Sequence, residues 1–294
     1  MEQQEKSRLT VIIPAYNEAE TLTHTLPDVL AYAKQRNWKV ICVNDGSKDR
    51  TKEILAQYSD NVCLKAVHHK VNRGYGGALK SGIRNADTEY LVTIDADGQH
   101  YLEDIDKLMD LITARDADMV VGSRKGLASA TKIRGLGKWL IRMIAKVLMP
   151  IEIYDINSGM KIYRTELVKN YIRLCPNSMA FSDIVTLVFI NNRHLVLETP
   201  IRIKQRLAGE STIGPKTAVE TVAEILNIIV MFNPMKIFLP VSVLFVLLGL
   251  IWGVPIMVQG RGVSVGMSLL LTMGVFSFLL GLIAEQLSEI RKHM

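Results

Sequence analysis

The sequence predicts an α/β domain built on a mostly parallel sheet, followed by segments that associate with a membrane. Over residues 9–122, short apolar runs alternate with helical patterns, the arrangement that gives a parallel sheet with right-handed crossovers. Polar residues concentrate where the apolar runs end, which indicates a ligand site at the carboxyl edge of that sheet. Beyond residue 216, two long uncharged apolar stretches replace the alternation.

The apolar runs are the expected strands, since each is short and bounded by turn-forming residues. We expect strands at residues 9–15, 40–44, 62–67, 90–94 and 119–122. Apolar residues recur at helical spacing between them, which predicts helices at about residues 22–33, 48–58, 78–86 and 105–112. We expect Ser47 to cap the second of these helices, because a serine side chain accepts hydrogen bonds from first-turn amides.

Two carboxylates follow the fourth expected strand. Asp95 and Asp97 stand one residue apart, and Gln99 comes two residues later. Mg²⁺ and Mn²⁺ take carboxylate and amide oxygens and leave positions open for substrate phosphates, although the run alone also fits a solvated acidic turn. Asp45 and Arg124 end the second and fifth strands, so a parallel sheet would bring all these residues to one edge. That convergence favours a metal site that holds a diphosphate.

The glycine-rich run at residues 74–77 invites comparison with dinucleotide-binding loops. It does not fit their Gly-x-Gly-x-x-Gly spacing, because Leu79 stands where the last glycine would fall, and it follows the third strand rather than the first. We interpret it as the tight start of a helix, either near a phosphate or sugar or as a simple structural turn.

Composition constrains the compartment and the partners. The chain has 294 residues, a net charge of +6 and 49% hydrophobic residues, the excess of which lies in its last third. Its three cysteines, two of them in apolar runs, predict reduced thiols rather than a disulfide framework. The polar residues 1–6 hold no signal-peptide core, so we expect the catalytic part in the cytosol.

Residues 129–149 form a basic amphipathic pattern. Cationic residues recur every four positions opposite an apolar face, at Arg134, Lys138, Arg142 and Lys146. This pattern is typical of a helix in a membrane interface, and a surface helix packed on the domain is the alternative. A second amphipathic stretch spans residues 219–232.

Two uncharged stretches, residues 237–258 and 263–284, are each about long enough to cross a bilayer. They predict a transmembrane hairpin, a buried soluble hairpin being the alternative. Lys236, Arg291 and Lys292 flank its ends and only Arg261 lies in its turn, so the positive-inside rule places the catalytic domain in the cytoplasm. We therefore divide the chain into residues 1–215 as the catalytic domain, 216–236 as a juxtamembrane amphipathic helix, and 237–294 as the hairpin and tail.

Seven motifs in order resemble one family. They read VIIPAYNE (11–18), VNDGS (43–47), NRGYGGA (72–78), DADGQH (95–100), GSR (122–124), NSG (157–159) and RLAGES (206–211). The set resembles the inverting glycosyltransferases of family 2 with a GT-A fold, in particular the polyprenyl-phosphate glycosyltransferases such as dolichyl-phosphate mannose synthases and bacterial undecaprenyl-phosphate glucosyltransferases. The resemblance covers about residues 8–215. The Gln-x-x-Arg-Trp motif of processive synthases is absent, which argues against a polymerase.

The resemblance implies roles for the matching residues. Those expected to line the nucleotide pocket are Pro14, Tyr16, Glu18 and Asp45. Those expected to face the diphosphate are Asp95, Ala96 and Asp97, with Asp95, Asp97 and Gln99 as ligands of Mg²⁺ or Mn²⁺. The phosphate contacts would be Arg124 and Arg206. The sequence departs from the family where its usual Gly-Phe-Arg reads Gly159-Met160-Lys161 and where its usual lysine is Thr212.

We expect a single in-line displacement at the anomeric carbon of the sugar, with a polyprenyl monophosphate as the acceptor. The second pKa of a phosphate monoester is about 6, so the acceptor is already anionic and needs no strong base. Beside Arg124, the candidates for a positioning or base role are Asp155 first and Asp183 second, each of which also fits a helix or turn cap. The residues expected at the acceptor or membrane surface are Arg134, Lys138, Arg142 and Lys161.

The expected donor is a nucleotide-diphosphate sugar, UDP-glucose first and GDP-mannose second. The alternatives are transfer to another lipid acceptor, a metal-dependent hydrolase, and a non-catalytic membrane-anchored protein that binds nucleotide sugars. We expect no nucleic-acid partner. We also expect association of several copies of the chain, because a lone two-helix hairpin buries little surface against itself.

Overall fold

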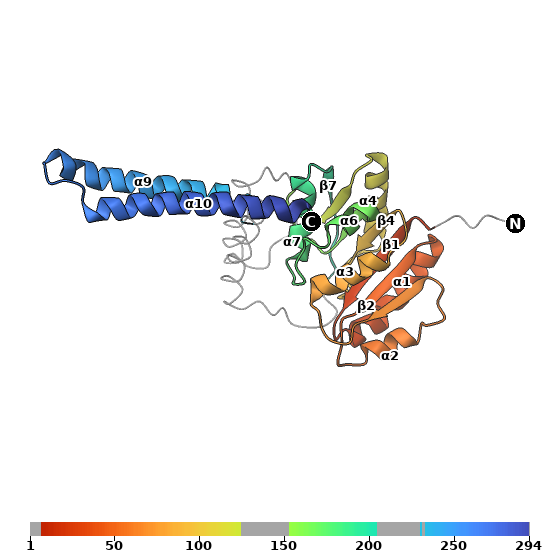
Figure 1. Cartoon of the computed structure of the whole chain (residues 1–294). Helices are drawn as coiled ribbons and strands as arrows, with labels where there is room; N and C mark the ends of the chain where they lie inside the picture. Colours follow the sequence, from red (N-terminus) through yellow and green to blue (C-terminus); the bar gives the residue numbers. More distant parts are fainter. Residues whose placement is uncertain (1–6, 125–152, 205–229, 231–232, 294) are drawn as a thin grey trace. The chain divides into compact units, whose positions relative to one another are not determined.

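The structure is a computed structural model, and it describes residues 7–124, 153–204, 230 and 233–293 (Figure 1). The chain divides into two compact units. The first comprises Met1–Ala128 and Ile151–Thr212, and the second Ser129–Pro150 and Ile213–Met294. The predicted basic helix at residues 129–149 and most of the predicted juxtamembrane helix lie outside the described residues.

The first unit is organised around one sheet. Among the described residues it has seven strands in the order β3-β2-β1-β4-β6-β5-β7. Their bounds are β1 Leu9–Ala15, β2 Lys39–Asn44, β3 Leu64–His68, β4 Tyr90–Thr93, β5 Met119–Ser123, β6 Lys161–Arg164 and β7 Val196–Pro200. Strand β6 pairs antiparallel with β4 and β5, whereas the remaining pairs are parallel. The predicted α/β fold with a mostly parallel sheet is confirmed, and β6 is a reversed strand that we did not predict.

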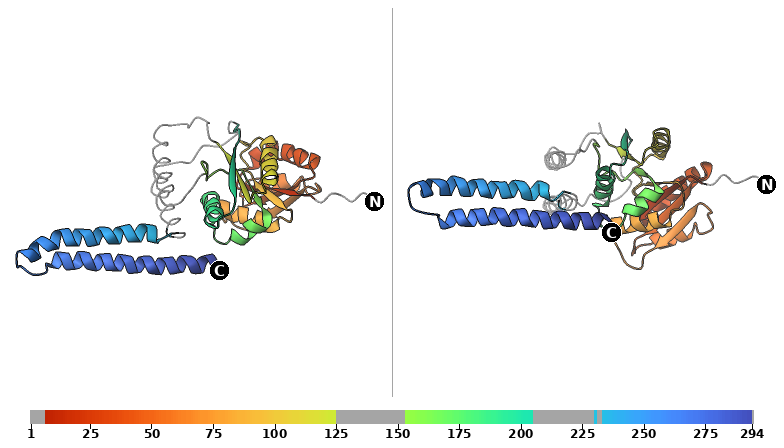
Figure 2. Two further views of the ribbon diagram at one scale, coloured as in Figure 1. Left: turned by 90° about the horizontal axis from the view of Figure 1, so that it is seen from above. Right: turned by 45° about the horizontal axis from the view of Figure 1, so that its top comes forward.

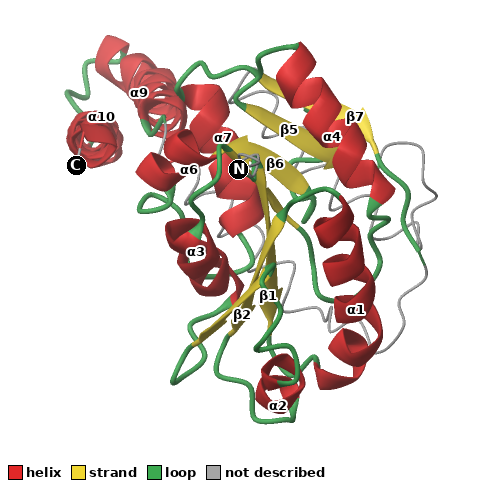
Figure 3. Ribbon diagram, turned by 90° about the vertical axis from the view of Figure 1, so that its right-hand side faces the viewer, coloured by secondary structure: helices red, strands yellow, loops and turns green. Residues whose placement is uncertain are grey.

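Helices cover both faces of the sheet (Figure 3). One face is covered by α1 (Ala19–Gln35) and α4 (Glu103–Ala114), and α2 (Thr51–Ala56) packs on α1. The opposite face is covered by α3 (Tyr75–Asn85), α6 (Thr165–Tyr171) and α7 (Phe181–Asn191). The interior strand β1 is consequently buried at every residue, as expected for a strand covered on both faces. Val11 and Ile13 belong to the main core, while Ile12 on the other face lies against α3.

The second helix begins later than predicted, and Ser47 does not cap it. Helix α2 starts at Thr51 after Arg50, and the side chain of Asp49 accepts hydrogen bonds from the N–H and hydroxyl of Thr51 at 3.0 and 2.6 Å. The hydroxyl oxygen of Ser47 accepts instead from the backbone N–H of Asn17 at 3.0 Å. A contact between two loops therefore replaces the predicted cap.

Two long apolar helices make up the described part of the second unit, and they run side by side in Figures 1 and 2. Helix α9 spans Met235–Val258 and α10 spans Val265–His293. Each is long and apolar enough to cross a membrane. The hydroxyl of Ser242 donates to the C=O of Gly274 at 2.8 Å, and a methyl group on Gly253 would fall 2.1 Å from the sulfur of Met267. Small residues thus allow the helices to approach closely, as in membrane helix pairs, and the predicted hairpin is confirmed.

Candidate active site

The carboxyl ends of four strands bring the predicted polar residues to one edge of the sheet. Strands β1, β2 and β4 run in one direction, and β5 shares it because it reaches β4 through the reversed strand β6. The loops after these strands carry Tyr16, Asp45, Asp95 and Arg124. The structure thus gathers residues that lie up to about a hundred positions apart, as the strand alternation predicted. Pro14 lies buried within β1, one residue before the strand ends.

Hydrogen bonds tie the β1–α1 loop to the β2–α2 loop. The backbone N–H of Lys48 donates to the side-chain oxygen of Asn17 at 2.8 Å. The backbone N–H of Glu18 donates to the hydroxyl of Thr51 at 3.1 Å, which fixes the start of α1. Asn17 itself has a left-handed backbone, with φ of 55°. Tyr16, in the first of these two loops, is 41% exposed, so its ring is available to a ligand at the strand ends.

Asp45 is a buried carboxylate with a fixed orientation. Its Oδ1 lies 2.6 Å from Nδ1 of His69 and accepts the backbone N–H of Arg73 at 2.9 Å. The other ring nitrogen of His69 lies 2.8 Å from the hydroxyl of Ser81 on α3. An aspartate, a histidine and a serine therefore form a short chain of hydrogen bonds that begins at the end of β2.

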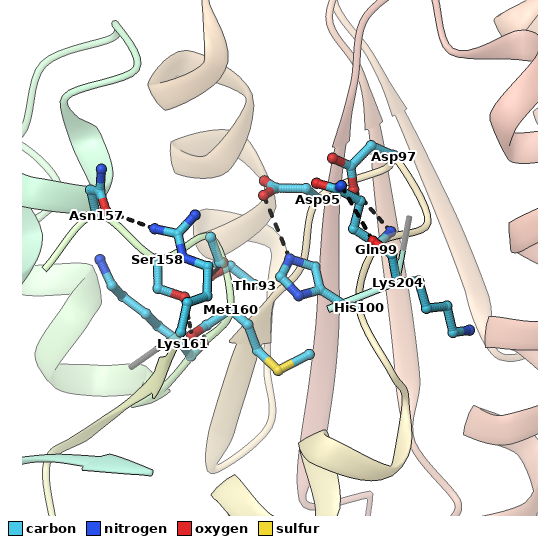
Figure 4. A network of polar contacts seen from close by, with 12 residues as sticks. Thr93, Asp95, Asp97, Gln99, His100, Asn157, Ser158, Met160, Lys161 and Lys204 are labelled. Atoms are coloured by element: carbon cyan, nitrogen blue, oxygen red, sulfur yellow. Dashed lines mark hydrogen bonds and ion pairs between the residues drawn. The ribbon is translucent and has the colours of Figure 1, made fainter. Parts of the chain in front are cut away.

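Asp95 lies at the end of β4, with its carboxylate turned toward His100 (Figure 4). The hydroxyl of Tyr75 donates to Oδ1 at 2.9 Å, and Nε2 of His100 lies 3.6 Å from Oδ2. Burial raises the pKa of Asp95, but the hydrogen bonds from His100 and Tyr75 and the charge of Arg124 outweigh it. The pKa of Asp95 is therefore below its ordinary value, which keeps the carboxylate ionised and able to bind a cation.

Gly159 leaves room for that carboxylate. A methyl group at this position would lie 2.1 Å from Oδ2 of Asp95 and 2.7 Å from its carboxyl carbon. No side chain fits at such distances, so residue 159 must be glycine while Asp95 keeps this position. The hydroxyl of Thr93 donates to the C=O of Gly159 at 2.8 Å and holds the two segments together.

Asp97 and Gln99 complete the carboxylate loop. Oδ1 of Asp97 accepts the backbone N–H of Gln99 at 3.1 Å, and the C=O of Gln99 accepts the N–H of Lys204 at 2.8 Å. The side-chain N–H of Gln99 donates to the C=O of Lys204 at 3.4 Å (Figure 4), so its amide oxygen remains an acceptor. Lys204 lies four residues beyond the end of β7, so the segment that follows this strand supports the loop.

The donor set fits a hard divalent cation. Across residues 7–124, 153–204, 230 and 233–293, no three His, Cys, Asp or Glu side chains form a metal cluster. Mg²⁺ does not require one, because it commonly takes one or two carboxylates and completes its shell with water and substrate phosphates. Asp95, Asp97 and Gln99 offer two carboxylates and an amide oxygen from a single loop, so the predicted cation site stays a prediction that this donor set fits.

Arg124 and Asp155 form a bidentate ion pair. Nε and Nη2 of Arg124 donate to the two carboxylate oxygens of Asp155, each at 2.7 Å, and the backbone N–H of Arg124 donates to Oδ2 at 2.9 Å. Nη2 also donates to the side-chain oxygen of Asn157 at 2.7 Å. Burial raises the pKa of Asp155, but the hydrogen bonds that Arg124 donates and the charge of the arginine lower it by more, so the pKa lies below its ordinary value. A carboxylate so held is a weak base, so the geometry favours positioning over proton transfer.

Lys161 contradicts its predicted place at the acceptor or membrane surface. Its side chain is fully buried in β6, where Nζ donates to the C=O of Ile156 at 2.6 Å and to the C=O of Ser182. Burial lowers the pKa of Lys161 to about 8, against the attraction of Asp183 and Asp155. The prediction failed because a cationic residue normally lies at the surface, whereas two backbone carbonyls from separate segments solvate this one. Asp183 itself lies in the first turn of α7.

The glycine-rich run begins α3, as predicted, and serves a structural contact. Gly74 has a left-handed φ of 85° directly before the helix. The backbone N–H groups of Gly76 and Gly77 donate to the C=O of Asn177 at 2.9 and 3.3 Å. These first-turn donors are thus occupied by the loop before α7, which favours the structural turn over a phosphate site.

Several predicted residues lie outside the described part of the chain: Arg134, Lys138, Arg142 and Arg206. Other residues of the site were not predicted, notably Tyr75 and His100 beside Asp95 and His69 beside Asp45. His100 and Tyr75 belong to motifs that we had identified without a role. His69 has no pattern of its own, although it follows directly on β3, next to the strand that carries Asp45.

Comparison with known proteins matches both parts of the chain. The family described as glycosyl transferase family 2 matches residues 10–172, and the GtrB C-terminal hairpin family matches residues 233–290. The second match and the two apolar helices support a membrane protein.

Several relatives extend over most of the chain, and two of them illustrate the similarity. The dolichyl-phosphate beta-glucosyltransferase of Trichomonas vaginalis is 28% identical over 248 residues, which cover 76% of this chain and 71% of that protein. The undecaprenyl-phosphate mannosyltransferase of Micrococcus luteus is 26% identical over 228 residues, which cover 74% of this chain and 92% of that protein.

The fold also matches a solved structure. Glucosyl-3-phosphoglycerate synthase from Mycobacterium tuberculosis superposes with a TM-score of 0.60 at 16% identity, over 76% of this chain and 80% of that one. A second structure of that enzyme, with Mn²⁺, UDP-glucose and phosphoglyceric acid, gives a TM-score of 0.55 at 17% identity over the same shares. These likenesses establish the GT-A-like fold.

Proposed function

The chain belongs to glycosyl transferase family 2, and from that premise we propose that it transfers a sugar from a nucleotide-diphosphate sugar to a membrane polyprenyl monophosphate. The relatives support this acceptor, because one acts on dolichyl phosphate and the other on undecaprenyl phosphate. The hairpin family match supports it as well, since a polyprenyl chain remains in the bilayer. One relative is named for glucose and the other for mannose, so the sugar is part of the proposal.

The observation that carries the proposal is the carboxylate loop at the end of β4. Asp95 and Asp97 stand at the carboxyl edge of the sheet, where α/β proteins bind ligands, with Asp45 two strands away and Arg124 at the end of β5. This arrangement suits a nucleotide diphosphate, with a base near Asp45 and phosphates near Asp95 and Asp97. Pro14, Tyr16 and Glu18 would line the nucleotide side.

Asp95, Asp97 and Gln99 would hold Mg²⁺ or Mn²⁺, which supplies positive charge to the diphosphate as it leaves. The structure of the glucosyl-3-phosphoglycerate synthase with Mn²⁺ and UDP-glucose supports a divalent cation for this fold. Tyr75 and His100 orient Asp95 and keep it ionised. The loop is thus prepared to bind charge before the donor arrives.

The acceptor phosphate would attack the anomeric carbon in line with the departing diphosphate, which inverts the configuration. A polyprenyl monophosphate is already anionic near neutral pH, because the second pKa of a phosphate monoester is about 6. The reaction therefore needs orientation more than proton removal. Asp155 would meet this need by fixing the guanidinium of Arg124 through Nε and Nη2, which leaves the Nη1 hydrogens to face a phosphate. Asp183 is the second candidate for this positioning role.

We also propose that the catalytic domain faces the cytoplasm, where nucleotide sugars are made. Lys236, Arg291 and Lys292 flank the two spans, and Arg261 alone lies between them. The positive-inside rule then places both ends of the hairpin on the cytoplasmic side. Arg206, Arg134, Lys138 and Arg142 remain proposed contacts for phosphates and the membrane surface, and self-association of the chain remains a proposal as well.

The test is a transfer assay with the full chain in detergent. Radiolabelled UDP-glucose and GDP-mannose are each supplied with polyprenyl phosphate or diacylglycerol, in the presence of Mn²⁺ or of excess EDTA. We expect label in polyprenyl phosphate from UDP-glucose, with EDTA abolishing it. Label in diacylglycerol alone would contradict the proposed acceptor. Release of free sugar without lipid would instead indicate a hydrolase.

A further inference from the structure

The hydrogen-bond chain at the end of β2 has a feature that its sequence motif does not predict. The carboxylate of Asp45 is held from one side only: Oδ1 lies 2.6 Å from His69 Nδ1 and 2.9 Å from the backbone N–H of Arg73. A carboxylate oxygen offers about two lone-pair sites, so these two donors occupy Oδ1. Oδ2 has no hydrogen-bond partner among residues 7–124, 153–204, 230 and 233–293, and it is not among their fully buried unpaired atoms.

His69 and Ser81 fix the orientation of the Asp45 carboxylate through a chain of hydrogen bonds. An ionised carboxylate can only accept, so Nδ1 of His69 carries the hydrogen that points at Asp45. In the neutral ring Nε2 is then an acceptor, and it takes the hydroxyl hydrogen of Ser81 at 2.8 Å. The side chains of His69 and Asp45 are only 5% and 3% exposed, so the surrounding protein prevents either from turning away. The ring therefore holds one defined oxygen of Asp45 outward.

We propose that His69 and Ser81 are positioning residues that leave Asp45 a single free acceptor, and that the nucleotide site therefore selects uracil over guanine. The inference rests on the proposed function, because it assumes that a nucleotide diphosphate binds at this edge. It deepens that function by naming the class of donor, a uridine-diphosphate sugar.

The base edges explain the selection. Uracil presents one N–H donor, at N3, between two carbonyl oxygens, so one carboxylate oxygen satisfies it. Guanine presents two adjacent donors, at N1 and N2, which match both oxygens of a carboxylate as a fork. With Oδ1 already occupied, guanine would leave one donor without a full partner in a desolvated site. An unpaired buried donor weakens binding by about tenfold or more.

The experiment measures the dissociation constants of UDP and GDP for the full chain in detergent with Mn²⁺, together with donor KM and kcat. For wild type we expect UDP to bind at least about tenfold more tightly than GDP. His69→Leu releases Asp45, and the ratio of GDP to UDP dissociation constants should fall to about 3 or less. Donor KM should rise about tenfold while kcat stays within about threefold, because Asp45 does not touch the bond that breaks.

Two milder variants keep the test decisive where His69→Leu does not fold. In His69→Asn the amide can donate to Oδ1 in place of Nδ1, so the nucleotide preference should largely return. Ser81→Ala removes only the outer link and should lower the preference by about twofold to fivefold.

His194 provides a matched control. It also bridges a carboxylate and a hydroxyl, at 3.3 Å from Asp118 and 2.9 Å from Tyr171, but at the opposite edge of the sheet. His194→Leu should lower Tm without changing the nucleotide preference.

The outcomes separate this inference from the proposed function. Equal affinities of UDP and GDP for wild type, or an equal change in preference in His69→Leu and His194→Leu, would overturn the role of His69 and Ser81. Transfer to polyprenyl phosphate from a guanosine donor alone would also overturn it, while the proposed function stands. If neither nucleotide binds wild type, the proposed function itself fails.

Discussion

Gly159→Ala is a small change that should inactivate the site and leave the fold intact. The new methyl group would lie 2.1 Å from Oδ2 of Asp95 and 2.7 Å from its carboxyl carbon, whereas ordinary contact begins near 3.4 Å. The difference, 3.4 − 2.1 = 1.3 Å, is the least distance by which the carboxylate oxygen must move. That movement separates Asp95 from Tyr75 and His100 and displaces the proposed cation ligand.

The displacement of the Asp95 carboxylate should reduce turnover much more than it reduces stability. A misplacement of about 1 Å in a catalytic group reduces turnover by about a hundredfold. The displaced group is a short side chain rather than backbone, so the stability cost falls at the low end of overpacking, about 1 kcal/mol. We therefore expect kcat/KM to fall about a hundredfold and Mn²⁺ affinity about tenfold or more, while Tm falls by only a few degrees.

Gly82→Ala is the matched control. Its methyl group would lie 2.4 Å from Cγ2 of Ile12, also well inside ordinary contact distance but in an apolar part of the core. This variant should lose stability without losing Mn²⁺ affinity. Assays compare Mn²⁺ titration by calorimetry, Tm and radiolabel transfer for both variants. If Gly159→Ala keeps wild-type Mn²⁺ affinity and turnover, the carboxylate of Asp95 is not a ligand and the reasoning is refuted.

Three further predictions follow from buried charges and thiols. Asp155→Asn should lower kcat by about tenfold to a hundredfold at every pH from 6 to 9, because Asp155 orients Arg124. If the variant instead lost the acidic limb of the pH profile of kcat/KM, Asp155 would act as a general base. The pKa of Asp155 is lower in the folded protein than in the unfolded chain, so the ionised carboxylate stabilises the fold. The Tm difference between wild type and Asp155→Asn should therefore persist at neutral pH and vanish as the pH falls below about 4. The pKa of Lys161 is about 8 in the folded protein and ordinarily 10.5, so between these pH values the unfolded chain binds more protons than the folded one. The Tm of wild type should therefore rise relative to that of Lys161→Met as the pH increases from about 8 to 10.5. A Tm difference that stays constant over this range would contradict the lowered pKa of Lys161. Burial raises the pKa of the Cys42 and Cys175 thiols to about 12, whereas Cys63 is half-exposed. A maleimide reagent, followed by mass spectrometry, should therefore label Cys63 first and the other two cysteines only on unfolding. Equal labelling of all three cysteines in the folded protein would contradict this prediction.

The strands and their carboxyl ends follow from local pattern. Strand β1 is apolar throughout because it is buried on both faces, and that property can be read from the sequence. The gathering of Asp45, Asp95 and Arg124 then follows from the parallel order of the strands. This is why the gathering of the carboxylate loop with Asp45 and Arg124 could be predicted before its geometry was known.

Long-range contacts could not be read in the same way. Strand β6 has four residues and begins with a lysine, so neither its length nor its polarity indicates a buried central strand. Lys161 can be buried because the carbonyls of Ile156 and Ser182 both accept hydrogen bonds from its Nζ. Local sequence does not show that Ser182, 21 residues further along the chain, lies beside Lys161. The pairing of Arg124 with Asp155 joins positions 31 residues apart. In each case tertiary contact overrides the local preference.

The central claim is that Asp97 helps to hold a cation at which the sugar is transferred to polyprenyl phosphate. The most direct test is radiolabel transfer from UDP-glucose to polyprenyl phosphate by wild type and Asp97→Asn over a range of Mn²⁺ concentrations. Asp97→Asn keeps the size of the side chain and removes one ligand charge. The account predicts that wild type requires Mn²⁺ and that the variant needs at least about tenfold more of it and loses most of its turnover. Equal turnover and equal Mn²⁺ dependence of the two proteins would contradict it.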